Sequence, residues 1–264
     1  MNNKDLEIER LEEQDLEESS FDGEKKKDNR KKDYIVFDRV TKEYNNNSTS
    51  TVALSNVSFT IDEGELVIFL GHSGAGKTTA LNLLGGMDLV TSGDIIVGNQ
   101  KITKYDVERL TDYRKNDIGF IFQFFNLMQN LTVKENIELA TEIKGVELEP
   151  MDILQKVGLQ DKLNKFPSQL SGGEQQRVSI ARAIAKQPKI LLCDEPTGAL
   201  DYKTGKQILS LIQKTCREEK VTTIVITHNR SIINMADRII HFNSGQIVDI
   251  SLNENPVDVE ELEW

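Results

Sequence analysis

The chain contains few cysteines, few prolines and few aromatic residues for its length. Of its 264 residues only two are cysteine, five are proline and one is tryptophan. Cys193 lies inside an apolar segment and Cys216 inside an expected helix, so the pair does not suggest the disulfide framework of a small secreted domain. A reducing cytoplasm is therefore the expected compartment.

Long hydrophobic runs are also missing. The longest, "LVIFL" (66–70) and "KILLC" (189–193), have the length of a strand. A membrane-spanning helix needs about 20 consecutive apolar residues. The sequence therefore predicts no membrane span.

An excess of positive charge is the third absence. The formal charge is −11, and most of it lies at the two ends of the chain. Residues 1–33 hold 12 acidic and 8 basic residues, and residues 249–264 hold six acidic and no basic ones. Residues 34–248 are nearly neutral, with 25 acidic and 24 basic residues. A nucleic-acid-binding body is usually basic, so no nucleic-acid partner is expected. We interpret residues 1–33 as a charged, disordered extension. Its basic run 25–32 is interpreted as a solvated linker, with binding to RNA or to an anionic membrane as the alternative. Residues 249–264 are expected to form an acidic tail.

The body, residues 34–248, has the pattern of an α/β fold. Segments 34–40 and 52–61 read as strands on either side of the polar turn 45–50, which predicts an antiparallel N-terminal part. Apolar strands then alternate with helices, which predicts a mainly parallel sheet buried on both faces. A helical insert is expected at about 124–170, and "NSG" predicts a hairpin between the last two strands.

One motif indicates a phosphate-binding site. "GHSGAGKT" (71–78) fits the spacing G-x-x-x-x-G-K-[ST], follows an expected strand and opens an expected helix. Gly71, Gly74 and Gly76 allow the backbone N–H groups to form a concave anion site, to which the helix N-terminus adds partial positive charge. Lys77 can reach the β- and γ-phosphates, and the Thr78 hydroxyl can ligate Mg²⁺.

A second motif supplies the acids that such a site needs. In "ILLCDEP" (190–196) four apolar residues form a strand, and two carboxylates follow where it ends. Asp194 is placed to hold Mg²⁺ and Glu195 to orient or deprotonate water. Two solvent-facing acids at a strand end are the alternative.

Two further polar side chains end strands of the same expected sheet. His228 closes "TTIVITH", and Gln123 closes "IGFIFQ". Because ligands of open α/β sheets lie at the carboxyl ends of strands, both are candidates for the same site. His228 can donate to a γ-phosphate, and Gln123 can contact Mg²⁺ and water.

The stretch "LSGGEQQR" (170–177) is a second glycine-rich turn far from the first. A helix N-terminus after Ser171 suits a phosphate. The alternative is a helix cap, with Ser171 as the cap and Glu174 as its capping-box partner, and the two interpretations are compatible.

Together, these motifs in this order resemble the ATP-binding cassette (ABC) ATPases over about residues 34–248. The resemblance implies the core of a P-loop nucleoside triphosphatase with ATP and Mg²⁺ as ligands. It also implies that Ser171, Gly172 and Gly173 complete the site of a second copy, so that two chains sandwich two ATP molecules head to tail.

The resemblance assigns further roles residue by residue. Tyr44 resembles the aromatic residue that stacks on adenine, and Asp201, in "GALD", resembles a contact that couples the two sites across the dimer. His72 stands where many relatives carry a proline or a small residue, and we expect it to be tolerated. The residues that the resemblance places around ATP in the phosphate loop are Gly71, His72, Ser73, Gly74, Ala75, Gly76, Lys77, Thr78 and Thr79.

Within the family, "NLLGGMDLVTSG" (82–93) and "FNLMQNLTVKENI" (125–137) resemble the lipoprotein-release, macrolide-export and cell-division group. That similarity implies a separate four-helix permease with a large extracytoplasmic domain, and a place for this chain on the cytoplasmic face of the membrane. Transport of a peptide, lipoprotein or drug-like substrate and signalling to a cell-wall hydrolase both remain open. A soluble ABC protein of DNA repair or translation fits less well, because coiled coils, zinc modules and a second cassette are not seen.

The run "FFNLMQNL" (124–131) directly follows Gln123. Its apolar residues suit the core of the helical insert, but its aromatic and methionine content is also typical of protein interfaces. We expect some of these side chains to be exposed and to receive a cytoplasmic helix of the permease.

Overall fold

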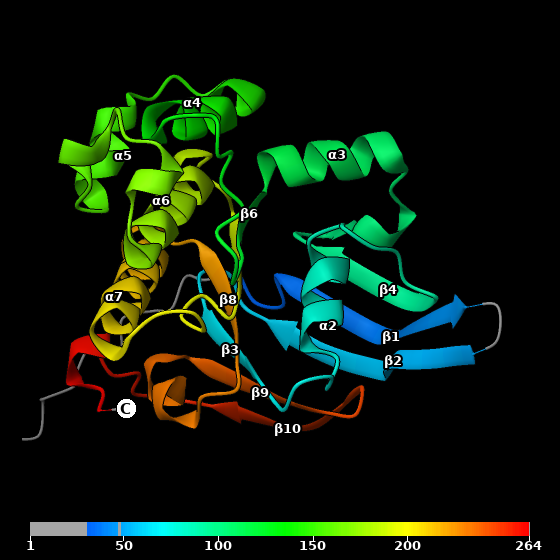
Figure 1. The fold of residues 1–264 in the computed structure, drawn as a ribbon. Coiled ribbons are helices and arrows are strands. Elements are labelled where there is room, and N and C mark those ends of the chain that lie inside the picture. Colours follow the sequence, from blue (N-terminus) through cyan, green and yellow to red (C-terminus); the bar gives the residue numbers. More distant parts are fainter. Residues whose placement is uncertain (1–30, 47–48, 264) are drawn as a thin grey trace, which may run out of the picture. The chain divides into compact units, whose positions relative to one another are not determined.

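The computed structural model describes residues 31–46 and 49–263 (Figure 1). Residues 31–263 belong to one compact unit, which begins at Lys31. The predicted extension 1–33 lies outside the described residues except for its last three. Of those, Lys31 accepts a hydrogen bond from the Glu63 amide, and the Asp33 amide donates to Asp62 Oδ1.

The N-terminal part of the unit is a four-stranded antiparallel sheet in the order β2-β1-β4-β5. Apolar residues of β1 and β2 point to one side, where Phe37 stacks on Phe59 with ring centroids 4.3 Å apart. β1 continues to Asn46 and β2 begins at Thr49, so both strands extend into the segment 45–50 that was predicted as a turn. The strands of this sheet are β1 (Ile35–Asn46), β2 (Thr49–Ile61), β4 (Ser92–Val97) and β5 (Gln100–Lys101).

A six-stranded sheet in the order β10-β9-β3-β8-β7-β6 forms the centre of the unit. β9, β3, β8, β7 and β6 run parallel, and only β10 is antiparallel. β3 and β8 are buried along their whole length, as expected for strands that are covered on both faces. The strands are β3 (Leu66–Leu70), β6 (Ile118–Ile121), β7 (Ile190–Asp194), β8 (Thr222–Thr227), β9 (Arg238–Asn243) and β10 (Gln246–Leu252).

Helices and the small sheet cover the two faces of the central sheet. Alternate residues of β3 enter different cores: Ile68 packs with the helices of the insert, and Phe69 packs with α2 and the antiparallel sheet. In Figure 1, α4 to α7 accordingly lie on one side and α2 on the other. The α-helices are α2 (Lys77–Leu84), α3 (Val107–Asn116), α4 (Val133–Lys144), α5 (Pro150–Lys156), α6 (Gly172–Ala185) and α7 (Tyr202–Glu219). Short 3-10 turns are η1 (Ile102–Lys104), η2 (Gln160–Lys162), η3 (Pro167–Gln169), η4 (Arg230–Met235) and η5 (Val259–Glu261).

The predicted acidic tail from residue 249 onward needs correction. β10 continues to Leu252, and the segment after it packs on α7, where Val259 and Leu262 are 0% and 7% exposed. The Lys206 ammonium donates to the Glu260 and Leu262 carbonyls. The segment is acidic, but its two apolar side chains, three residues apart, tie it to the folded unit.

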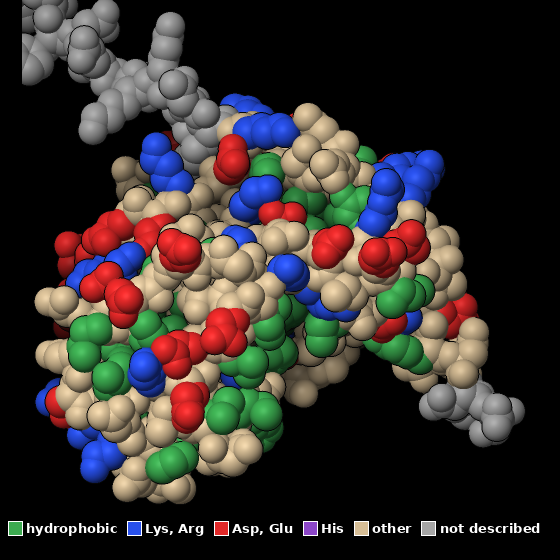
Figure 2. Space-filling model, turned by 90° about the horizontal axis from the view of Figure 1, so that it is seen from above, with side chains coloured by type: hydrophobic (Ala, Val, Ile, Leu, Met, Phe, Trp, Pro, Cys, Tyr) green, Lys and Arg blue, Asp and Glu red, His purple; other side chains and the backbone are tan. Residues whose placement is uncertain are grey.

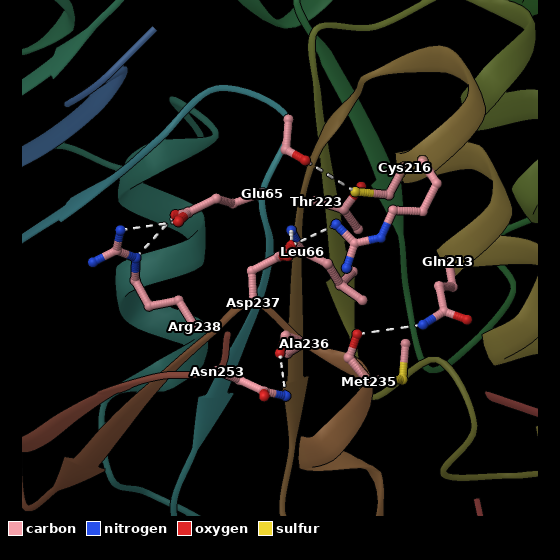
Figure 3. Close-up of polar contacts among 12 residues, drawn as sticks. Glu65, Leu66, Gln213, Cys216, Thr223, Met235, Ala236, Asp237, Arg238 and Asn253 are labelled. Carbon is pink, nitrogen blue, oxygen red and sulfur yellow. Dashed lines mark hydrogen bonds and ion pairs between the residues drawn. The ribbon is translucent and has the colours of Figure 1, made fainter. Parts of the chain in front are cut away.

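Polar contacts fasten the edge of the central sheet where β3 and β9 begin (Figure 3). Arg238 forms a bidentate ion pair with Glu65, with both N···O distances at 2.9 Å. Asp237 accepts from the Leu66 amide and from Arg217, each at 2.7 Å. These contacts hold the amino ends of the strands and leave the opposite, carboxyl edge for other groups.

The structure confirms the predicted class, a mainly parallel α/β core with an antiparallel N-terminal part and a helical insert. In the described part of the chain, no helix is both long enough and apolar enough to cross a membrane.

Candidate functional site

The phosphate loop joins β3 to α2 and is shaped by glycines. Gly74 and Gly76 have φ angles of 77° and 100°, a region that side chains rarely adopt. A Cβ at Gly71 would lie 2.4 Å from the Phe242 carbonyl oxygen, and one at Gly76 would lie 2.7 Å from that of Ala53. Within the loop, Ala75 is buried and its amide donates to the His72 carbonyl. The loop is therefore held against β2 and β9 by contacts that exclude larger residues.

Lys77, the first residue of α2, is buried and turned back into the loop. Its ammonium donates to the Gly71 and His72 carbonyls at 2.7 and 2.9 Å. Burial lowers the Lys77 pKa, against the opposing effect of Glu195 and Asp194. A phosphate oxygen entering the loop can replace these carbonyls as acceptor, and its negative charge would favour the protonated amine.

His72 is exposed and contacts both its neighbour in the loop and the end of β9. Its ring nitrogens lie 2.7 Å from the Ser73 carbonyl oxygen and 3.0 Å from Asn243 Oδ1. These two bonds raise the His72 pKa, the bond to Ser73 most. The departure from a small residue at this position is thus accommodated by β9.

Asp194 and Thr78 meet at the carboxyl end of β7. The Thr78 hydroxyl donates to Asp194 Oδ1 at 3.3 Å. Burial raises the Asp194 pKa, and the neighbouring Glu195 charge adds to the effect. A cation bound here would offset that cost, because opposite charge stabilises a buried carboxylate.

Glu195 follows Asp194 in a backbone conformation that is unusual for a side-chain-bearing residue, with φ at 46°. Such positions concentrate at functional sites because the surrounding structure must impose them. Here the Glu195 amide donates to Ile226 on β8, and the carboxylate Oε1 lies 3.1 Å from Nδ1 of His228. The structure thus brings the predicted carboxylate and histidine into direct contact.

Gln123 lies two residues beyond β6, outside the strand that the sequence predicts for it. A Cβ at Gly198 would be 3.1 Å from Gln123 Nε2 and 3.4 Å from Glu195 Oε2. The Gln123 amide and the Glu195 carboxylate therefore both lie beside Gly198, a residue that the sequence singles out only as part of "GALD".

Among the described residues, no group of three or more His, Cys, Asp or Glu side chains is arranged to hold a metal ion. The Thr78 hydroxyl and the Asp194 carboxylate offer oxygen donors at this edge, and the Gln123 amide carries a further candidate oxygen. Mg²⁺ prefers oxygen ligands and commonly takes only one or two from protein, with phosphate oxygens and waters supplying the rest. The donor set fits Mg²⁺ bound together with a phosphate.

Tyr44 lies on β1 and is 39% exposed. Its hydroxyl donates to Asp88 Oδ2 at 2.7 Å, while the Lys42 ammonium lies 4.6 Å from the ring centroid and donates to Asp88 Oδ1. Partial burial, the Asp88 contact and the Asp88 charge raise the Tyr44 pKa, against the effect of the Thr79 hydroxyl. Lys42 and Asp88 were not identified from the sequence, because Asp88 lies 46 residues from Lys42 and 44 from Tyr44, and such distant contacts leave no local pattern.

The turn at 170–173 opens α6, as predicted, and the helix begins at Gly172. Ser171 is the N-cap and forms a capping box with Glu174. Gly173 is fixed by packing, since a Cβ there would lie 2.2 Å from Thr204 Cγ2 on α7. Gly172 is exposed, and a Cβ there would make only ordinary contacts of 3.6 and 3.9 Å with Phe125 and Leu200.

Asp201 is the N-cap of α7. Its carboxylate accepts from the Thr204 amide at 3.1 Å and from the Thr204 hydroxyl at 2.7 Å, and these bonds lower the Asp201 pKa. The side chain is therefore ordered by its own helix and placed beside the start of α6.

The structure brings most, but not all, of the predicted residues together. The phosphate loop, Asp194, Glu195, Gln123 and His228 gather at the carboxyl edge of the central sheet. By contrast, α6 packs in the core on the face of the sheet opposite to α2. Ser171 and Gly172 of this turn are exposed, and among the described residues no hydrogen bond joins the turn to the phosphate loop of its own chain.

The sequence and the fold both match known proteins. Residues 54–198, just over half of the chain, match the family model described as ABC transporter. An uncharacterized ABC transporter ATP-binding protein of Methanocaldococcus jannaschii, MJ0796, is 42% identical over 222 residues, which is 81% of this chain and 94% of that protein. A solved dimer of the same cassette bound to ADP and Pi superposes with a TM-score of 0.77 at 39% identity, covering 83% of this chain and 98% of that one.

A putative ABC transporter ATP-binding protein of Mycoplasma pneumoniae is 37% identical over 235 residues. This match takes in 87% of this chain but only 50% of the relative. The chain therefore spans about half the length of that relative.

Proposed function

Because the chain belongs to the family of ABC transporter ATP-binding proteins and hydrolyses ATP, we propose that it is the motor subunit that drives a separate membrane permease. Two copies are proposed to close head to tail around two ATP molecules. The observation that carries the proposal is the separation of Ser171–Gly173 from the phosphate loop of the same chain. An exposed helix N-terminus with a hydroxyl and a bare glycine suits a phosphate that is presented by another molecule.

We propose a step for each residue of the edge. The loop amides and Lys77 bind the phosphates, and the Tyr44 ring stacks on the base. Glu195 accepts a proton from the attacking water as the water oxygen bonds to the γ-phosphorus and the bond to the β-phosphate oxygen breaks, releasing ADP and phosphate. His228 bonds to Glu195 and to the γ-phosphate and so orients both. Asp201, at the start of α7, contacts the partner and couples the two sites.

Mg²⁺ is proposed to bind at Thr78, Asp194 and Gln123. When bound it would neutralise charge on the phosphate oxygens. Because Gln123 is bonded directly to the segment 124–131, a movement of Gln123 at the metal site would also move this segment, which leads to α4.

That segment supports a docking surface for the permease. Leu127 is buried, whereas Phe124 and Met128 are 74% and 47% exposed, so the prediction of exposed apolar residues here is confirmed. Figure 2 views the end of the unit that carries α3 and α4, where hydrophobic side chains lie among charged ones. A short amphipathic helix is the ligand that such a surface fits.

We further propose that the permease is of the four-helix type and that the chain works on the cytoplasmic face of the membrane, exporting or extracting a peptide, lipoprotein or drug-like substrate. The support is the similarity of residues 82–93 and 125–137 to that group.

Met128→Asp tests the docking surface, with Met151→Asp on α5 as the matched control, since both methionines are exposed, at 47% and 41%. Tagged chains are recovered from membranes of the native host, and ATPase activity is measured with and without the co-purifying permease. We expect Met128→Asp to keep the basal rate within about twofold but to lose membrane retention and permease stimulation, because a carboxylate in an apolar contact is costly to bury. The control should keep both. Equal retention and stimulation of the two variants would place the docking surface elsewhere.

A further inference from the structure

One buried glutamine of "LSGGEQQR" has no role in the chemistry described so far. Gln176, on the second turn of α6, is 0% exposed. Its side-chain amide donates both of its hydrogens to backbone carbonyls, at 3.3 Å to Phe122 and at 2.9 Å to Pro196. These carbonyls belong to loops that lie 54 and 20 residues away in the sequence.

The two carbonyls adjoin the residues that act on the γ-phosphate. Phe122 immediately precedes Gln123, and Pro196 immediately follows Glu195. We propose that Gln176 is a positioning residue that fixes the Gln123 and Glu195 segments relative to each other and ties both to the helix that begins at Ser171. One amide thus joins three segments that have no other side chain in common among the described hydrogen bonds.

The remaining atom of this side chain indicates why a glutamine is present. Gln176 Oε1 is buried and has no hydrogen-bond partner among the residues that the structure describes. An unpaired buried acceptor is unfavourable, and an apolar side chain of equal length would avoid it. The donor end of the amide is therefore the part that the site uses.

The position of α6 gives the two bonds a further consequence. In the proposed dimer, the N-terminus of α6 faces the partner's ATP, while Gln123 and Glu195 act on the chain's own ATP. Gln176 lies between them, so a shift of α6 upon closure moves the carbonyls beside Gln123 and Glu195. The positioning role rests on ATP hydrolysis by the cassette and does not depend on the identity of the permease.

Gln213, on α7 near the amino edge of the central sheet, provides a matched control. It is also a buried glutamine, about three turns along α7, and its amide donates to the Met235 and Val257 carbonyls at 3.3 and 2.9 Å. Figure 3 shows it among the contacts at the amino edge of the sheet. Its Oε1 also accepts from the Val259 amide, so its loss removes more bonds than the loss of Gln176.

The test compares Gln176→Met with Gln213→Met in the purified full chain. Methionine keeps the length of the side chain and removes the donor. We expect Gln176→Met to lower kcat by about 10- to 100-fold, as misplacement by about 1 Å can do, with ATP affinity and KM unchanged within about twofold. Gln213→Met should lower the Tm at least as much and leave kcat within about twofold.

Two results would overturn the proposal. The first is that Gln176→Met retains the wild-type kcat. The second is that Gln213→Met lowers kcat as much as Gln176→Met does, which would show that the loss follows from reduced stability in general. If Gln176→Met does not fold, Gln176→Asn is measured instead. It keeps the amide but is too short to reach both carbonyls, so it must show the same loss of kcat at unchanged affinity. Absence of hydrolysis in the wild-type chain would contradict the motor function itself and not the role of Gln176.

Discussion

At the scale of single residues, the site depends on backbone conformations that other residues would not tolerate. The glycines of the phosphate loop adopt positive φ angles or lie against neighbouring carbonyls, and Glu195 adopts a positive φ although it carries a side chain. The glycines are visible in the sequence as a motif. The conformation of Glu195 is not, because it is imposed by the bonds of its backbone and carboxylate to β8 and His228.

Glu195→Gln tests the role of this carboxylate. The amide keeps the shape of the side chain but cannot accept the proton of the attacking water, so hydrolysis should slow by about 10²-fold or more while ATP still binds. The readouts are phosphate release and equilibrium nucleotide binding. Glu254→Gln, which removes the same charge from an exposed position, should be unaffected. A Glu195→Gln variant that hydrolyses ATP at the normal rate would remove Glu195 from the proposed mechanism.

The sequence predicted the residues of the edge better than the residues that support them. Asp194, Glu195 and His228 end or follow strands, and parallel strands bring such residues to one edge, so their meeting could be foreseen. Asp88, which holds Tyr44, and Gln176, which joins two loops, act through contacts between distant segments. Neither position carries a local signal for its partner.

At the scale of elements, α6 is secured at both ends. Its N-terminus has the Ser171–Glu174 capping box, which the sequence predicted. At its C-terminus, the Lys144 ammonium of α4 donates to the carbonyls of Lys186 and Gln187, where a cation also complements the helix dipole. Lys186 itself donates to the Arg114 and Ile118 carbonyls and so joins α6 to α3 and β6.

Lys186 makes stability depend on pH in a window that can be stated. Burial lowers its pKa to about 8, with smaller effects of Lys144 and Arg182. The unfolded value is about 10.4, so between about pH 8 and 10.4 the unfolded chain binds more protons and the free energy of unfolding rises with pH. Between pH 7.5 and 9.5, the free energy of unfolding of the wild type should rise by on the order of 1 kcal/mol more than that of Lys186→Met, after allowance for solvent screening. Urea unfolding of both proteins at both pH values measures it.

If the free energy of unfolding changes equally with pH in the wild type and in Lys186→Met, the pKa of Lys186 is the same in the folded and unfolded chains, and the prediction is wrong. If the free energy of unfolding of the wild type falls with pH relative to the variant, the predicted direction is contradicted, because the folded state would then bind more protons than the unfolded one.

The sequence located the elements more accurately than it judged the C-terminal end. Periodicity and caps gave the strands and α6 to within a few residues. The acidic composition of 249–264 hid two apolar side chains, Val259 and Leu262, that bury themselves on α7. Composition reports the average of a segment, whereas packing depends on the spacing of its few apolar residues.

At the scale of the whole molecule, we propose that the ATP site of one chain is completed by a second copy of the chain. The phosphate loop lies at the carboxyl edge of the sheet, and the turn that opens α6 belongs to the other layer of the same unit. The solved cassette with which the fold superposes is described as a dimer bound to ADP and Pi. That likeness and the exposed Gly172 lead to the same arrangement.

The most direct measurement is light scattering of the Glu195→Gln chain with ATP and Mg²⁺, with and without Gly172→Asp. Glu195→Gln alone should form a stable dimer, because ATP is bound but not consumed. Adding Gly172→Asp should leave a monomer that still binds ATP, because a carboxylate about 4 Å from a γ-phosphate is repelled by about 4 kcal/mol at an effective dielectric of about 20. Gly172→Ala, which meets only ordinary contacts within its own chain, controls for folding of the monomer. A Glu195→Gln chain that stays monomeric at saturating ATP, or a Gly172→Asp monomer that no longer binds ATP, would contradict a site shared between two chains.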